Sequence, residues 1–203
     1  MGMSDVIAVF KTAGIAADDD GISENAAVGN NAALTIGGAL ASGGSVTLNS
    51  GQLVTITSAG DDDEISFTVV GTDIFDDALT ESVTGANAGV ATSSGFFKTI
   101  ASITAVGDPA GNVKAGVSAS CADNIFAGPA RLKGAYIVNS ATAGTIKFRT
   151  TSVSGTTLME VGTVASATVT RDVNIPEEGI RFSNGIIITY TGGTFTSMTA
   201  FHA

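Results

Sequence analysis

The sequence contains few of the residue types on which most catalytic and metal centres depend. It has one histidine, one cysteine and no tryptophan among 203 residues. A tetrahedral zinc site needs three or four protein ligands, and a nucleophilic triad needs a precisely oriented base. The histidine, His202, stands next to the last residue, where we expect fraying to prevent such orientation. These shortages predict a protein that is not an enzyme, with no catalytic residues, no cofactor and no metal.

Cysteine and long apolar runs are equally scarce. The single cysteine, Cys121, excludes an internal disulfide framework, and we expect it to be a small buried hydrophobe. The first ten residues lack the basic cluster and apolar run of a signal peptide. No segment approaches 18 consecutive apolar residues, so we expect no membrane-spanning helix and no membrane partner. We therefore predict a protein that is made in the cytoplasm and stays soluble until it meets its partner.

Charged residues are sparse and unevenly distributed. They form 14% of the chain, against about 25% in an average soluble domain. Residues 1–128 hold 15 acidic and 3 basic residues, whereas residues 129–203 hold 4 acidic and 6 basic. An acidic surface repels phosphate backbones, and the second segment lacks clustered Lys and Arg. The charge pattern therefore argues against nucleic-acid binding.

The pattern that is present is alternation with period two. In Glu64–Val70 the apolar residues Ile65, Phe67 and Val69 share one face, as in a half-buried strand. No window shows a helical period. Many Gly and few Pro residues favour tight turns between strands. The expected strands cover residues 52–58, 64–70, 79–84, 96–106, 112–117, 132–138, 144–150, 157–162, 167–175, 185–190 and 197–201.

Turn residues and charge divide the chain into three expected parts. Gly128-Pro129 lies where the charge balance changes, so we place a boundary there between an acidic β domain, 34–128, and a C-terminal β domain, 129–203. Residues 1–33 are expected to form an irregular arm with at most one short strand. The predicted fold is all-β, with two small antiparallel β-sandwich or jelly-roll-like units and an extended N-terminal arm. The arm is either a frayed terminus or a segment that orders on a neighbouring subunit.

Two acidic clusters are the main candidates for a ligand site. Asp18-Asp19-Asp20 and Asp61-Asp62-Asp63-Glu64 offer the oxygen ligands that calcium prefers. Neither has the spaced loop with a distal glutamate that marks a calcium-binding loop. We favour the interpretation that both are solvated turns, whose charges discourage pairing between strand edges.

Several strand-and-turn segments resemble those of tailed-bacteriophage virion structural proteins of the capsid decoration, or cement, type. In the first half they are Val54–Gly60, Ile65–Asp73, Leu79–Gly89 and Phe96–Ile103; in the second half they are Leu132–Val138, Ala143–Arg149 and Pro176–Ile186. The motifs carry no catalytic residue, so the resemblance transfers no functional site. It indicates membership of a particle better than position within it.

The resemblance implies a structural virion protein that decorates and stabilises a bacteriophage capsid by bridging capsid subunits. The implied partners are the phage major capsid protein and further copies of the chain, as a dimer or trimer. A tail, baseplate or fibre-adaptor protein is the structural alternative, and a host-surface glycan-binding module or a depolymerase are alternatives of other classes. The absence of Trp and the presence of only two Tyr weigh against the last two, since sugar rings stack on such side chains.

Binding through a broad surface requires exposed apolar side chains. Apolar side chains in the N-terminal segment are unfavourable in solvent, which favours their burial against a partner. Each candidate phenylalanine could instead belong to the core. We expect the near-neutral residues 129–203 to face the capsid shell, with the reverse orientation left open. The candidate interface residues are Val6, Ile7, Val9, Phe10, Phe96, Phe97, Phe182 and Phe201.

Overall fold

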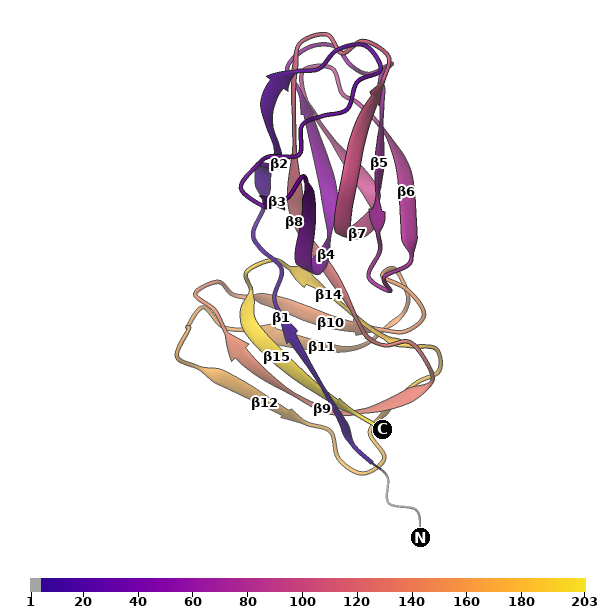
Figure 1. Cartoon of the computed structure of the whole chain (residues 1–203). Coiled ribbons are helices and arrows are strands. Elements are labelled where there is room, and N and C mark those ends of the chain that lie inside the picture. Colours follow the sequence, from indigo (N-terminus) through magenta and orange to yellow (C-terminus); the bar gives the residue numbers. More distant parts are fainter. Residues whose placement is uncertain (1–4) are drawn as a thin grey trace. The chain divides into compact units, whose positions relative to one another are not determined.

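The computed structural model describes residues 5–203 and contains fifteen strands (Figure 1). Residues 5–203 contain no helix, so the predicted all-β class is confirmed. It follows that the described part of the chain offers no helix able to cross a bilayer. The period-two pattern was a sound guide because β-branched residues suit a pleated surface. In β5 (Ser66–Thr72), for example, Phe67 and Val69 are buried and the residues between them are half-buried.

The chain folds as two compact units. One consists of Ala16–Ser120 and is called the acidic unit, because it holds 13 acidic and 2 basic residues. The other combines residues 5–15 with Cys121–Ala203 and is called the terminal unit; residues 1–15 and 121–203 hold 6 acidic and 7 basic residues. The structural division therefore also places the negative charge in one unit, with a balance of −11 against +1, close to the −12 against +2 on the two sides of Gly128-Pro129.

The acidic unit is built on the strand order β8-β4-β7-β5-β6, with β2 paired to β8 and β3 to β4. Its buried side chains include Val54, Phe67, Phe97 and Ile103. Its strands are β2 (Asp18–Ala27), β3 (Ala41–Ser42), β4 (Ser45–Ser58), β5, β6 (Ala78–Thr84), β7 (Val90–Val106) and the first part of β8 (Asn112–Phe126).

The terminal unit is a sandwich of two sheets. One sheet has the order β1-β15-β9-β12, with β13 also paired to β9, and we call it the small sheet; the other runs β11-β10-β14-β8. Both contribute to one apolar core that includes Leu132, Phe148, Phe182 and Ile188. The strands are β1 (Ile7–Thr12), the rest of β8, β9 (Ala130–Asn139), β10 (Gly144–Arg149), β11 (Thr157–Thr163), β12 (Thr170–Asn174), β13 (Ile180–Phe182), β14 (Ile186–Thr191) and β15 (Phe195–His202).

The unit boundaries differ from those expected at 33/34 and 128/129. They fall at 15/16 and at 120/121, in the middle of β8. Gly128-Pro129 lies in a short connection between β8 and β9, with Cys121 and Ala130 on either side in the same core cluster. Residues 5–33, expected as one arm, are divided between the units through β1 and β2. Gly and Pro mark turns within a domain as well as turns between domains. Such residues therefore could not distinguish a domain boundary from a turn inside a domain.

Candidate interaction surface

The segment that carries four of the candidate interface residues is a sheet edge. β1 pairs antiparallel with β15 along its whole length, from Ile7 opposite His202 to Thr12 opposite Ser197. Within the described residues, β1 is an edge strand of the small sheet: one side pairs with β15, and the other side pairs with no strand. Val9 packs against the core, whereas the side chains of Val6 and Phe10 are 54% and 65% exposed. The N-terminal segment is therefore ordered on its own chain and still presents apolar side chains to solvent.

Alternation along β9 and β15 defines the side of the small sheet that faces away from the core. Ala135, Ile137, Met198 and Ala200 belong to the core cluster, so the residues between them point to the opposite side. We call that side the outer face. The strand register arranges it as three rows across β1, β15, β9 and β12: Phe10–Thr199–Tyr136–Asp172, Ala8–Phe201–Gly134–Asn174 and Thr12–Ser197–Val138–Thr170.

The outer face combines aromatic side chains with very little charge. Phe10, Phe201 and Tyr136 lie on neighbouring positions of its first two rows, and Tyr136 is 41% exposed. The twelve residues of the three rows include one charged residue, Asp172 at the β12 edge, and the same alternation places Arg131 and Arg181 on this side beyond the rows, at the β13 end. Contacts with other proteins are enriched in aromatic residues and depleted of charge at their centre. The outer face therefore has the composition of a protein-binding surface.

The structure brings some of the candidate interface residues together and separates others. Phe10 and Phe201 belong to the small sheet and Val6 directly precedes it, while Phe96 is a half-buried residue of β7 in the acidic unit. Phe97 and Phe182 are fully buried, so for them the core alternative holds. Tyr136, which is exposed on the outer face, was not among the candidate residues. The available signal was its place in the alternating stretch Leu132–Val138. Its neighbours Ala135 and Ile137 point into the core, so Tyr136 points away from it.

A buried polar network fastens the N-terminal segment to the terminal unit. The hydroxyl of Tyr190 donates to Asp123 Oδ2 at 2.9 Å and accepts from the backbone N–H of Gly14 at 3.0 Å. Lys11 Nζ lies 3.7 Å from Asp123 Oδ1. Asp123 and Tyr190 are both buried. Hydrogen bonding compensates the cost of burying the carboxylate, and it ties β1 to β8 and β14.

Compared with known proteins, the chain matches no family model, no curated protein and no solved structure at a significant level.

Cys121 and His202 are both core residues of the terminal unit. Burial and the nearby Asp123 carboxylate raise the pKa of Cys121 to about 12, so the thiol stays protonated and unreactive near neutral pH. His202 is 2% exposed, and its ring stacks at 4.6 Å on that of Phe126. The expectation that fraying would leave His202 unoriented is wrong, because β15 holds it opposite Ile7 and Leu132. Burial lowers the pKa of this histidine.

We expect acidification to destabilise the protein through His202. Since burial lowers its pKa in the folded state, the unfolded chain binds more protons as the pH falls past about 6.5. Its contribution to stability is thus fully present above that pH and declines below it. Thermal unfolding is followed by circular dichroism at about pH 7.5 and about pH 5.5. Between the two, the unfolding midpoint of the wild type should fall more than that of His202→Phe. Equal falls would assign the pH dependence to other groups.

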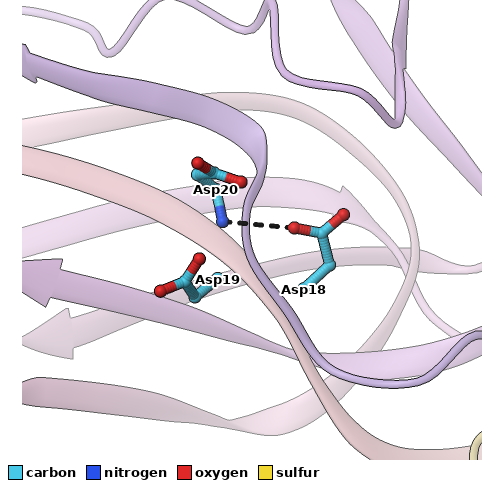
Figure 2. A group of neighbouring side chains, drawn as sticks. All are labelled: Asp18, Asp19 and Asp20. Carbon is cyan, nitrogen blue, oxygen red and sulfur yellow. Dashed lines mark hydrogen bonds between the residues drawn. The ribbon is translucent and has the colours of Figure 1, made fainter.

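The first acidic cluster was expected to be a solvated turn, but it lies on the strand β2 (Figure 2). The carboxylate oxygens of Asp18, Asp19 and Asp20 lie within 4.8 Å of one another, and the backbone N–H of Asp20 donates to Asp18 Oδ1 at 3.4 Å. Gly116 allows the backbone of β2 to lie close to β8, because a β-carbon at that position would collide with the Asp18 carbonyl. Lys114 donates to Asp19, and that hydrogen bond raises the pKa of the lysine. One of the three carboxylates is thus already paired with a cation.

We expect calcium to leave the stability of the protein unchanged. The Lys114 ammonium would have to give up Asp19 before a cation could take all three carboxylates. A ligand at 100 times its dissociation constant adds about 2.7 kcal/mol to the free energy of unfolding. Thermal unfolding in millimolar calcium and in chelator should therefore give the same midpoint. If calcium clearly raised the unfolding midpoint, and Asp19→Asn abolished that rise, the prediction would be wrong and the cluster would be a metal site.

The terminal unit also has two shallow hollows. One, of about 440 Å³, lies between β11 and β12 and is lined by Met159, Glu160, Val161, Gly162, Arg171, Asp172, Val173 and Asn174. Glu160 in it pairs with Lys147 at 3.4 Å. The other, of about 250 Å³, contains Arg131 and Arg181, which are cross-strand neighbours. Two guanidinium groups placed side by side can bind a carboxylate or phosphate group.

Proposed function

We propose that the protein is a structural virion component that decorates a bacteriophage capsid and stabilises it by bridging capsid subunits. The observation that carries the proposal is the outer face of the terminal unit, whose three rows across β1, β15, β9 and β12 hold exposed aromatic residues and one charged residue. Binding through such a face needs neither a deep pocket nor a catalytic group. The virion setting rests on the resemblance of the segments quoted above to virion structural proteins.

Charge distribution supports a role in coating a particle. The terminal unit is close to neutral, so its outer face can approach a protein shell without a large electrostatic penalty. The acidic unit has a large excess of negative charge. Many copies on one particle would repel one another and neighbouring particles through these units, which favours dispersed particles.

Bridging also requires a protein that resists deformation. The extended antiparallel pairing in both units satisfies the backbone groups through long ladders, such as β4 with β7 and β15 with β9. The network of Asp123, Tyr190 and Gly14 adds a tie between three segments distant in sequence. Each unit can therefore carry a load without unfolding locally.

The first test counts copies in purified particles of the phage that encodes the chain. Quantitative mass spectrometry against the major capsid protein should find hundreds of copies per particle. A dozen or fewer would assign the protein to the tail, baseplate or fibre adaptor, and absence from particles would overturn the virion assignment.

The second test measures docking through the outer face. Tyr136→Ala should weaken binding of the full-length protein to particles that lack it by about thirtyfold, as expected for a central aromatic contact worth about 2 kcal/mol. Phe75→Ala is the matched control, because Phe75 is exposed to a similar degree in the acidic unit. Unchanged binding of Tyr136→Ala would show that another surface docks.

A further inference from the structure

The free edge of β1 presents backbone groups that a further strand would satisfy. The N–H of Ala13 donates to Thr196, so in this antiparallel ladder the peptide groups of Ile7, Val9 and Lys11 also face β15. The peptide groups of the alternate residues Ala8 and Phe10 therefore point away from the sheet. Each exposes one N–H donor and one C=O acceptor along the edge.

This edge lacks the devices that keep strands from pairing. β1 contains no proline, and its register with β15 is unbroken from Ile7 to Thr12. Its one charged residue, Lys11, turns toward Asp123. The opposite edge of the same sheet, β12, instead carries exposed Arg171 and Asp172. Natural proteins commonly place charge on sheet edges to prevent association, so the difference marks β1 as an edge that accepts a partner.

We propose that β1 pairs antiparallel with β1 of a second copy of this chain around a two-fold axis at Val9. In this register Ala8 of each copy lies opposite Phe10 of the other, and their outward peptide groups form about four hydrogen bonds. Each Phe10 ring lies beside the small Ala8 side chain of the partner. The pairing also covers Val6, which then lies opposite Thr12 of the partner.

The second copy fits this edge better than an unrelated strand on two grounds. The alternation of large and small side chains, Phe10 with Ala8, is self-complementary about the axis. The register also brings no like charges together, since Lys11 of one copy lies opposite Ile7 of the other. The two small sheets become one continuous sheet, and the two outer faces become one larger face.

The inference does not depend on the proposed function and is tested on the purified full-length chain alone. Sedimentation velocity over a range of concentrations should show a species of twice the 20.1 kDa chain mass. Ala8→Pro removes one outward donor without touching the bonds to β15, and Ala8→Lys places a charge on the edge. Each should weaken dimerisation by about tenfold or more. Thr170→Lys, an exposed position of the β12 edge, is the control and should leave the dimer intact.

Hydrogen exchange read by NMR supplies a measurement that needs no variant. The amides of Ala8 and Phe10 should be protected at concentrations where the dimer predominates and should exchange rapidly on dilution. A chain that is monomeric at all concentrations would overturn the inference. So would a dimer that survives both Ala8 variants with these two amides unprotected. Particle binding by a monomeric variant would leave the proposed function standing while edge pairing failed.

Discussion

Replacing Phe182 by alanine should lower the free energy of unfolding by about 3–5 kcal/mol. The side chain is fully buried in the core of the terminal unit, contributed by the short strand β13. Removing it takes away the apolar contacts of the ring and leaves a cavity that the two sheets cannot fully close. Urea denaturation followed by circular dichroism measures the change.

The matched control is Phe10→Ala in the same unit. Phe10 is 65% exposed, so at a protein concentration where the monomer predominates its replacement should change the free energy of unfolding by less than about 0.5 kcal/mol. A small effect of Phe182→Ala would mean that this ring is not a core residue in solution. A large effect of Phe10→Ala would mean that β1 stabilises the unit through a side chain that the structure leaves exposed.

Replacing Tyr190 by phenylalanine should lower the free energy of unfolding by about 1–3 kcal/mol. The ring stays and keeps its contact with Phe195 at 4.7 Å, so the change isolates the hydroxyl. Its loss removes the donor to Asp123 Oδ2 and the acceptor for the Gly14 N–H. Buried polar groups that lose a partner carry their desolvation cost without compensation. Urea denaturation again provides the measurement.

Tyr136→Phe is the control for the hydroxyl deletion, since Tyr136 lies on the outer face and is partly exposed. It should leave stability nearly unchanged. A second readout separates a local effect from a general one: in Tyr190→Phe, hydrogen exchange should rise most strongly over residues 7–14, which the network holds to β8 and β14. Uniform loss of protection across the terminal unit would show that the hydroxyl does not anchor this segment.

For some candidate residues the sequence left two alternatives, core or interface, and only one of them was correct. For Phe97 and Phe182 the choice between core and interface was open, because a strand of period two has two faces and the sequence does not say which is covered. For Tyr136 the alternation of β9 contained the answer, since Ala135 and Ile137 are buried on either side. It could be used only once the small sheet was known to have one solvated face.

The position of the N-terminal segment could not be predicted. β1 pairs with β15, about 190 residues away, and no local feature of Asp5–Phe10 specifies that partner. The same holds for His202, which pairs with Ile7 and Leu132 on the two neighbouring strands. Both were judged from their closeness to a chain end, although the pairing of a terminal strand within a sheet removes the fraying that such closeness implies.

By itself the sequence determined that the chain is all-β and that its negative charge lies mainly in its first 128 residues. These are properties of composition and short-range periodicity, which act before distant segments meet. Only the tertiary structure decided that the terminal unit takes residues from both ends of the chain, that β1 is an edge, and that Phe10, Phe201 and Tyr136 share one exposed face. Strand partners and covered faces depend on contacts between residues far apart in sequence, and a local pattern leaves those contacts open.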